Sequence, residues 1–183
     1  AAFNYINIKF SGSNTLGTNY KNLNDQTTID SLLYITGNAI VDCVSDNVGI
    51  ATSFIGRGGL KMDGGRLRIK KFNEANPMLD GYNNPYTLTG GVVEFYGTGS
   101  TSQQQIRGMD TVDRIISYYN IEVNANAANY STSSGLDKAG NVDLTSSFYL
   151  KNVMNVNYPA VLRMDESDFI YAPLSGAGPE IVN

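Results

Sequence analysis

Alternation between apolar and polar residues is the dominant pattern along this chain. In "GGRLRIKKF", residues 64–72, Leu67 and Ile69 fall on one side of an extended strand, and Arg66 and Arg68 fall on the other. Such a strand has one buried face and one face in water. The pattern therefore predicts short β-strands that cover a common core.

The same alternation recurs along the rest of the chain and predicts an all-β protein. It places these residues in the core: Val93 and Phe95, with Glu94 facing outward between them; Tyr119, Ile121 and Val123; Val142, Leu144, Phe148 and Leu150; and Leu162 and Met164. Each run ends in Gly, Asn, Asp or Ser, which favour turns. Helical spacing is limited to residues 109–117, where Met109, Val112 and Ile116 allow at most one turn.

Two architectures satisfy this pattern. The preferred prediction is a parallel β-helix or solenoid of right-handed coils, because the glycine pairs in "GRGGLKMDGGRLRIKK" and "LTGGVVEFYG" suit sharp corners between short strands. The alternative is an antiparallel β-sandwich, in which the "DG" pairs at 63–64 and 80–81 would form hairpin turns.

The composition of the chain excludes or disfavours several classes of function. The 183 residues suit one domain, and a net charge of −4 disfavours nucleic acid and anionic membranes as partners. No stretch approaches the roughly 20 apolar residues of a transmembrane segment. The single cysteine, Cys43, is predicted to be a buried apolar residue, and the absence of histidine excludes Cys-His catalysis and disfavours zinc.

Carboxylate pairs are the only candidate catalytic groups. Asp63 with Asp80, or Asp165, Glu166 and Asp168 in "MDESD", could provide the acid pair of a polysaccharide lyase or glycoside hydrolase. Aspartates at turns more often bond to neighbouring backbone groups. The prediction is therefore a protein that is not an enzyme and has no catalytic residue, with the polysaccharide-degrading enzyme as the alternative.

Two ligand sites are candidates. In "LDKAGNVDL", Asp137, Asn141 and Asp143 offer the hard oxygen ligands that calcium prefers, although the spacing is not that of an EF-hand and a plain polar turn explains it better. Calcium is the only cofactor that these residues suggest. Tyr82 and Tyr86 flank "NNP" in a long loop, where they could stack on sugar rings or cap the end of a coil.

Four phrases together carry a family resemblance. "GGLKMDGGRLRI", "LTGGVVEFYGTGSTSQQQI", "YYNIEVNANA" and "GNVDLTSSFYLKNVMNV" resemble the recurrent phrase of very large, repetitive cell-surface proteins of gliding and biofilm-forming Bacteroidetes, over roughly residues 55–165. The resemblance implies a secreted adhesin-like segment, exported across the outer membrane by the type IX system. It also implies a stiff stalk for adhesion or gliding.

The implied partners are a cell-surface polysaccharide or other surface ligand, and outer-membrane proteins of export or attachment. A structural role in an outer-membrane assembly is a further alternative. Residues 1–54 match weakly and are assigned to an N-terminal β-rich segment, whereas residues 55–183 form the repeat region, with a long loop at 73–87 and an expected continuation past the chain end. "DSL" and "DTV" resemble the family's O-glycosylation motif, with Ser31 and Thr111 as acceptors on loops.

Overall fold

The computed structural model describes residues 3–13, 19–23, 27–43, 59–70, 86–96, 104–106, 108, 115–124, 141–144, 147–157, 160–163, 170–171 and 180–182. The described residues contain strands and no helix, which confirms the all-β prediction. The strands are β1 (Phe3–Gly12), β2 (Tyr20–Leu23), β3 (Thr27–Gly37), β4 (Ile40–Cys43), β5 (Gly59–Ile69), β6 (Thr87–Phe95), β7 (Gln104–Ile106), β8 (Ser117–Tyr118), β9 (Asn120–Val123), β10 (Asn141–Leu144), β11 (Phe148–Leu150), β12 (Val153–Val156), β13 (Val161–Arg163), β14 (Ile170–Tyr171) and β15 (Glu180–Val182).

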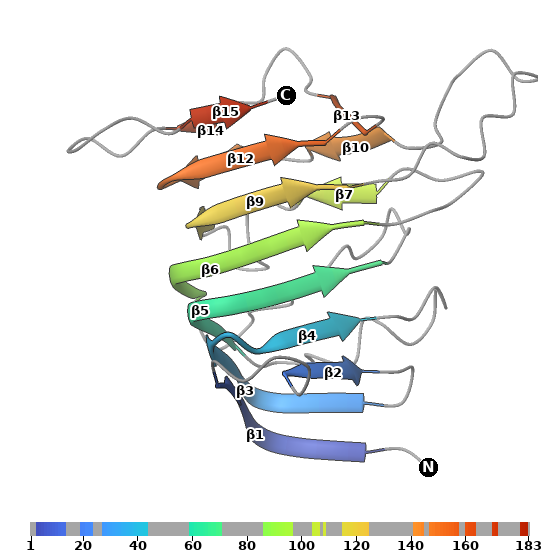
Figure 1. Ribbon diagram of the computed structural model, residues 1–183, viewed down its shortest axis with the longest axis vertical. Helices are drawn as coiled ribbons and strands as arrows, with labels where there is room; N and C mark the ends of the chain where they lie inside the picture. The colour runs from blue at the N-terminus through green and yellow to red at the C-terminus, as the bar shows by residue number, and fades with distance from the viewer. Residues whose placement is uncertain are drawn as a thin grey trace, which may run out of the picture.

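Most of these strands belong to one sheet. Its order is β1-β3-β5-β6-β9-β12-β15, with β4 also paired to β5 and β2 paired to β4. Two three-stranded sheets, β13-β10-β7 and β14-β11-β8, accompany it. Figure 1 shows the strands stacked one above another from the N-terminus at the bottom to the C-terminus at the top.

Each strand pairing in the described part of the chain is parallel. The antiparallel sandwich is therefore not the arrangement of the described strands. In particular, the "DG" pair at 63–64 lies inside β5 and does not form a hairpin turn. The second "DG" pair, at 80–81, lies outside the described residues.

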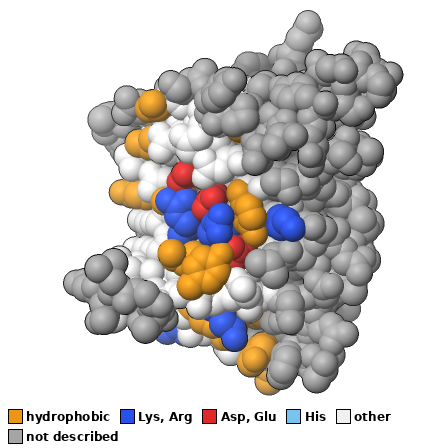
Figure 2. Space-filling view, turned by 45° about the vertical axis from the view of Figure 1, so that its right-hand side comes forward, with side chains coloured by type: hydrophobic (Ala, Val, Ile, Leu, Met, Phe, Trp, Pro, Cys, Tyr) orange, Lys and Arg blue, Asp and Glu red, His pale blue; other side chains and the backbone are white. Residues whose placement is uncertain are grey.

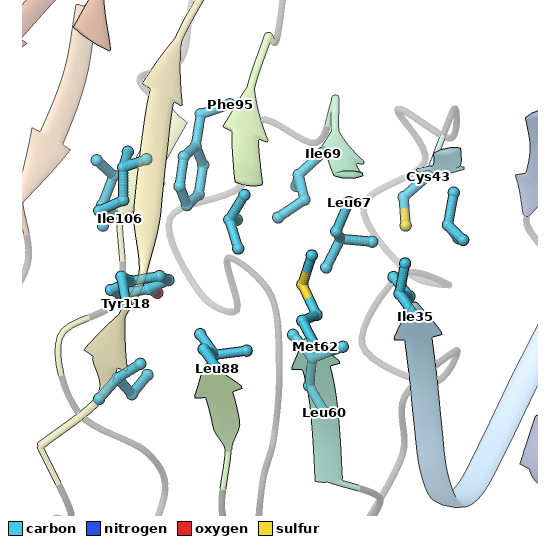
Figure 3. Packing of buried hydrophobic residues seen from close by; sticks show 14 of the residues in the cluster. Ile35, Cys43, Leu60, Met62, Leu67, Ile69, Leu88, Phe95, Ile106 and Tyr118 are labelled. Atoms are coloured by element: carbon cyan, nitrogen blue, oxygen red, sulfur yellow. The ribbon is translucent and has the colours of Figure 1, made fainter. Parts of the chain in front are cut away.

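Buried side chains of neighbouring strands lie in continuous columns. One column of register partners runs through Val41, Leu67, Val93, Ile121 and Met154, and a second runs through Leu23, Cys43, Ile69, Phe95, Val123 and Val156; all are buried. Figure 3 shows Cys43, Ile69 and Phe95 at one level of this core. Because parallel strands lie about 4.8 Å apart, each buried side chain packs on the equivalent side chain of the next strand.

The columns confirm the core predicted from β5, β6, β9 and β11. Phe148 and Leu150 are buried, as expected, and Leu162 is half-buried. Val142 and Leu144 lie in β10, but their side chains, like the whole of Met164, are outside the described part of the structure. Of the expected helical turn, residues 109–114 also lie outside it, and Ile116 is buried just before β8.

One core prediction is wrong. Tyr118, and not Tyr119, is fully buried, and its ring meets the Phe148 ring edge-on at a centroid distance of 5.3 Å. The chain bends at Tyr119, between β8 and β9, and Tyr119 is only half-buried. The bend shifts the alternation by one residue, so a strand pattern extended back from Ile121 selects the wrong tyrosine.

The ribbons of β5 and β6 bend (Figure 1), and each strand contains a glycine pair, at 64–65 and 90–91, where the pairing of the two strands is irregular. Gly65 and Gly91 have φ angles of 71° and 80°, a conformation that residues with a Cβ rarely adopt. A Cβ on Gly91 would lie 2.5 Å from the carbonyl oxygen of Gly64 and 2.7 Å from that of Gly65. The pairs at 64–65 and 90–91 lie inside single strands, β5 and β6, whereas the sequence placed them between short strands.

The first strands belong to the same stack as the rest. β3 pairs with the first half of β5 and β4 with its second half, so the sheet continues without a break from β1 to β6. The division into residues 1–54 and 55–183 stays a prediction from the sequence. Among the described residues there is no helix with the length and apolar character needed to cross a bilayer.

We expect Gly91→Ala to lower the free energy of unfolding by more than about 2 kcal/mol, because it combines an unfavourable φ with contact against two carbonyl oxygens. Thr87→Ala, at an exposed position of the same strand, is the matched control and should change stability by less than about 0.5 kcal/mol. Urea unfolding followed by circular dichroism measures both. Equal effects of the two substitutions would show that this position in β6 does not require glycine.

Candidate functional site

A network of charged and polar side chains covers the outer face of β4, β5, β6 and β9. We call it the polar ladder; its members are Tyr20, Asp42, Arg66, Arg68, Glu94, Tyr96, Glu122, Asn124 and Asn157. Asp42, Arg68, Glu94 and Glu122 are successive register partners in four adjacent strands. Figure 2 shows basic and acidic side chains gathered near the middle of one face.

Arg68 connects the largest number of ladder residues. Its Nη1 donates to Asp42 Oδ2 and to the Tyr20 hydroxyl, each at 2.7 Å, and its Nε donates to Glu94 Oε2 at 2.9 Å. Its guanidinium carbon also lies 4.2 Å from the centre of the Tyr96 ring, a cation–π geometry. One arginine of β5 therefore ties the preceding strand to the following one.

Arg66 bridges the two glutamates of the ladder. Its Nη1 donates to Glu94 Oε2 at 2.9 Å and to Glu122 Oε2 at 2.5 Å. The Asn124 amide donates to the other oxygens of the same two carboxylates, at 2.9 and 2.8 Å. Asn157 donates to Glu122 Oε1 at 3.1 Å and to Asn124 Oδ1 at 2.6 Å, which carries the network beyond β12.

The expectation that Glu94 faces water needs correction. Its residue lies on the outer side of β6, yet Glu94 is only 5% exposed, and Asp42 in β4 is 2% exposed. The pairing of Glu94 with Arg66 and Arg68 satisfies the carboxylate without water. A carboxylate so deeply buried persists as an ion only when it is paired and hydrogen-bonded.

The ion pairs set the protonation of the network. Burial alone would raise the pKa of Glu94, but hydrogen bonds from Arg68, Asn124 and Arg66 outweigh it, so the pKa lies below its ordinary value. Burial alone would lower the pKa of Arg68, but Glu94 and Asp42 raise it. Both partners are therefore charged at neutral pH.

Two tyrosine hydroxyls complete the hydrogen bonding of Asp42. Tyr20 and Tyr96 both donate to it, together with Arg68. Burial, followed by the hydrogen bond to Asp42 and then its negative charge, raises the pKa of Tyr96. Tyr20 remains 49% exposed, so its ring is the ladder's main aromatic surface in contact with solvent.

A smaller polar row crosses β1, β3 and the first half of β5. Lys9, Tyr34 and Lys61 are successive register partners, and the two ammonium groups lie 4.7 and 4.6 Å from the centre of the Tyr34 ring. The Tyr34 hydroxyl donates to Asp63. Hydrogen bonds from Thr36 and then Tyr34 lower the pKa of Asp63, which is exposed.

Most residues that the sequence nominates for a site lie outside the described part of the structure. These are Asp80, Tyr82, Thr111, Asp137, Asp165, Glu166 and Asp168. Tyr86 is described and packs half-buried against the core. Ser31 lies within β3, and not on a loop as expected. The candidate catalytic pair and the pair of candidate tyrosines therefore stay predictions from the sequence.

The calcium and cysteine predictions have different outcomes. Asn141 and Asp143 both lie in β10, where Asp143 is the register partner of Gln105 and Arg163, but their side chains are not described. Within the described ranges, no group of three or more His, Cys, Asp or Glu residues could hold a metal ion.

Cys43 is buried, as predicted, and burial followed by the charge of Asp42 raises the pKa of its thiol.

The sequence contained a signal for the polar ladder that the strand patterns alone did not reveal. Asp42, Arg68 and Glu94 follow one another at a spacing of 26 residues, as do the buried residues Val41, Leu67 and Val93. An alignment of the chain with itself at this spacing would have placed the opposite charges side by side. Glu122 breaks the spacing by two residues.

Comparison with known protein families, with curated proteins and with solved structures finds no match to this chain. The function must therefore be argued from the geometry. The polar ladder joins acid to base across neighbouring strands, and the carboxylates of Asp42, Glu94 and Glu122 accept their hydrogen bonds from other ladder residues. Such an arrangement is suited to holding strands in register.

We expect Arg68→Met to destabilise the protein by about 3 kcal/mol, because it leaves the buried carboxylates of Asp42 and Glu94 without their shared cation. Lys9→Met removes a cation that stacks on a tyrosine at the edge of the sheet, and should cost about 1 kcal/mol or less. Urea unfolding at pH 7 compares the two. Similar losses would mean that Arg68 contributes no more than a surface lysine.

Stability should also fall in acid because of Glu94. Its folded pKa lies below the unfolded value of about 4.3, so its contribution is complete above that pH and is lost as pH falls through the folded pKa. Glu94→Gln keeps the shape but removes the titration. The free energy of unfolding of the variant should be lower at pH 7 and should change less between pH 5 and pH 3, measured by urea unfolding. An unchanged slope would contradict this assignment.

Proposed function

We propose that this chain is a segment of a parallel β-solenoid and acts as a stiff, non-enzymatic scaffold in a secreted or cell-surface protein. The observation that carries the proposal is the continuity of the stack: apolar columns inside and a polar ladder outside both cross several successive strands in register. A single coil cannot bury its own apolar face, so stability depends on the neighbouring coils.

The order of the strands supports the solenoid. Strands β8, β9 and β10 belong to three different sheets, and β11, β12 and β13 visit the same three sheets in the same order. β14 and β15 begin the next round. A chain that repeats its path in this way adds one layer per round, and each layer covers the open edge of the previous one.

The use of the outer face supports a scaffold over an enzyme. An acid pair in a polysaccharide-degrading enzyme must be available to substrate, whereas Glu94 and Glu122 share Arg66 and Asn124. Their chemistry serves the stack itself. The hydrogen bonds between parallel strands run along the stack, so extension of the stalk would have to break many of them together.

The placement at the cell surface rests on the resemblance to repetitive proteins of Bacteroidetes exported by the type IX system. In that setting the stack is the stalk, and the loops between its strands display the contacts with a surface polysaccharide or another ligand. Export or attachment proteins of the outer membrane are the second class of partner. Ligand specificity belongs to loops, because loops vary without disturbing the columns.

The surface role can be tested on the native protein. Antibodies raised against residues 1–183 should bind intact cells of the source organism, and protease added outside the cells should remove the signal. Immunoblotting should show a reactive protein larger than this chain. A matched antibody against a cytosolic protein should give signal only after lysis.

Binding that appears only after lysis would overturn the surface role. Turnover of a polysaccharide by the isolated native protein, lost in Asp63→Asn, would instead support the enzyme alternative. Staining of intact cells without turnover of a polysaccharide would support the proposed role as a cell-surface scaffold.

A further inference from the structure

Strand edges lie at both ends of the described stack. In the described structure β1 pairs only with β3, β2 only with β4, and β15 only with β12. Six large apolar side chains are exposed among the described residues, and four of them, Tyr5, Ile6, Tyr20 and Val182, lie on these end strands. Exposed apolar edges of this kind invite pairing with another chain unless something prevents it.

Lys21 interrupts the apolar column at the N-terminal end. It is the register partner of Val41, and therefore heads the column that continues through Leu67, Val93 and Ile121. Side chains alternate along a strand, so Lys21 shares the core-facing side of β2 with the buried Leu23. Lys21 itself is exposed, because β2 pairs only with β4 among the described strands and its other edge is left uncovered by them.

The opposite end of the same column is apolar in sequence. Met154 is buried, and Ile181 of β15 is its register partner. If the β15 edge of one molecule paired in parallel with the β2 edge of another, Lys21 would enter the column next to Ile181. An ammonium group in that position would lose its water without gaining a carboxylate, which is strongly unfavourable.

We propose that Lys21 guards the N-terminal edge of the stack against head-to-tail pairing with the β15 edge of a second copy of this chain. The residues on either side of Lys21 in β2 would be compatible with this pairing. Tyr20 would become the register partner of Glu180, and Asn22 that of Val182; Tyr20, Asn22 and Val182 are all exposed to water. The guard is one inward-facing charge, a common protection of sheet edges. This inference rests on the register alone and does not depend on the proposed surface role.

The test compares the 183-residue chain with Lys21→Val and Lys9→Val. Lys9 lies on the neighbouring end strand β1, in the polar row outside the core, so Lys9→Val removes the same charge from the same end without changing the apolar column. Sedimentation velocity over a hundredfold range of concentration should show oligomers of Lys21→Val at concentrations at least tenfold below those at which the other two associate. Equal association of all three proteins, or a monomeric Lys21→Val, would overturn the proposal.

A crosslinking experiment identifies the contact. In the Lys21→Val background, Asn22→Cys and Val182→Cys place thiols on β2 and β15, at positions that head-to-tail pairing would bring together. A short bis-maleimide should then give a ladder of covalent oligomers that the same cysteines in the Lys21 background do not give. Oligomers that form without this crosslink would show a different contact and contradict the proposal.

A folding control keeps the result interpretable. Circular dichroism should show the same strand content in each variant. Lys21→Met, which keeps the length of the side chain and removes its charge, provides a second guard-free protein if Lys21→Val folds poorly. A folded Lys21→Met that remains monomeric would equally refute the guard.

Discussion

The structure depends on one constraint: parallel strands stack in register, so each side chain has the equivalent residue of the next strand as its neighbour. The constraint is favourable for apolar residues, since Leu67 stacked on Val93 buries both. It is unfavourable for identical charges, which would face each other across about 4.8 Å. The inner and outer faces of this protein therefore solve the same geometric problem with different chemistry.

On the outer face, like charges are kept apart in two ways: the sign of the charge alternates between neighbouring strands, and where two acids are neighbours they share a cation. Asp42, Arg68 and Glu94 alternate in sign, but Glu94 and Glu122 are direct neighbours of the same sign. Arg66, from a different column, reaches across both glutamates and neutralises their repulsion. The network also specifies the register, because a shift of one residue would separate the acids from the arginines and move the apolar column outward.

The features that were predictable from the sequence are those that a single strand determines. Alternation was sufficient for Leu67, Ile69, Val93 and Phe95. The alternation rule gave the wrong residue at Tyr119, where a bend in the chain shifts the alternation by one residue.

Features that depend on contacts between strands were harder to predict from the sequence. The burial of Glu94 depends on arginines 26 and 28 residues earlier, and strand patterns read one at a time do not connect these positions. The repeat spacing would have connected Arg68 to Glu94. The bridge from Arg66 to Glu122 needed the three-dimensional structure, because it crosses columns. Lys21 is similar: within "YKNL" it is an ordinary charged residue, and only its register with Val41 shows that it occupies a core position.

The middle and the end of the stack thus place charge by opposite rules. In the middle, Asp42 and Glu94 tolerate burial because each has a cation within hydrogen-bonding distance, supplied by a strand of the same chain. At the β2 edge, Lys21 occupies a core column in which no described residue is acidic, and it is tolerated because no described strand continues the column past it. A buried charge with a partner fixes one strand against the next, whereas a charge without one prevents the next strand from adding. The same electrostatic cost therefore both holds the described strands in register and opposes the pairing of another strand with the β2 edge.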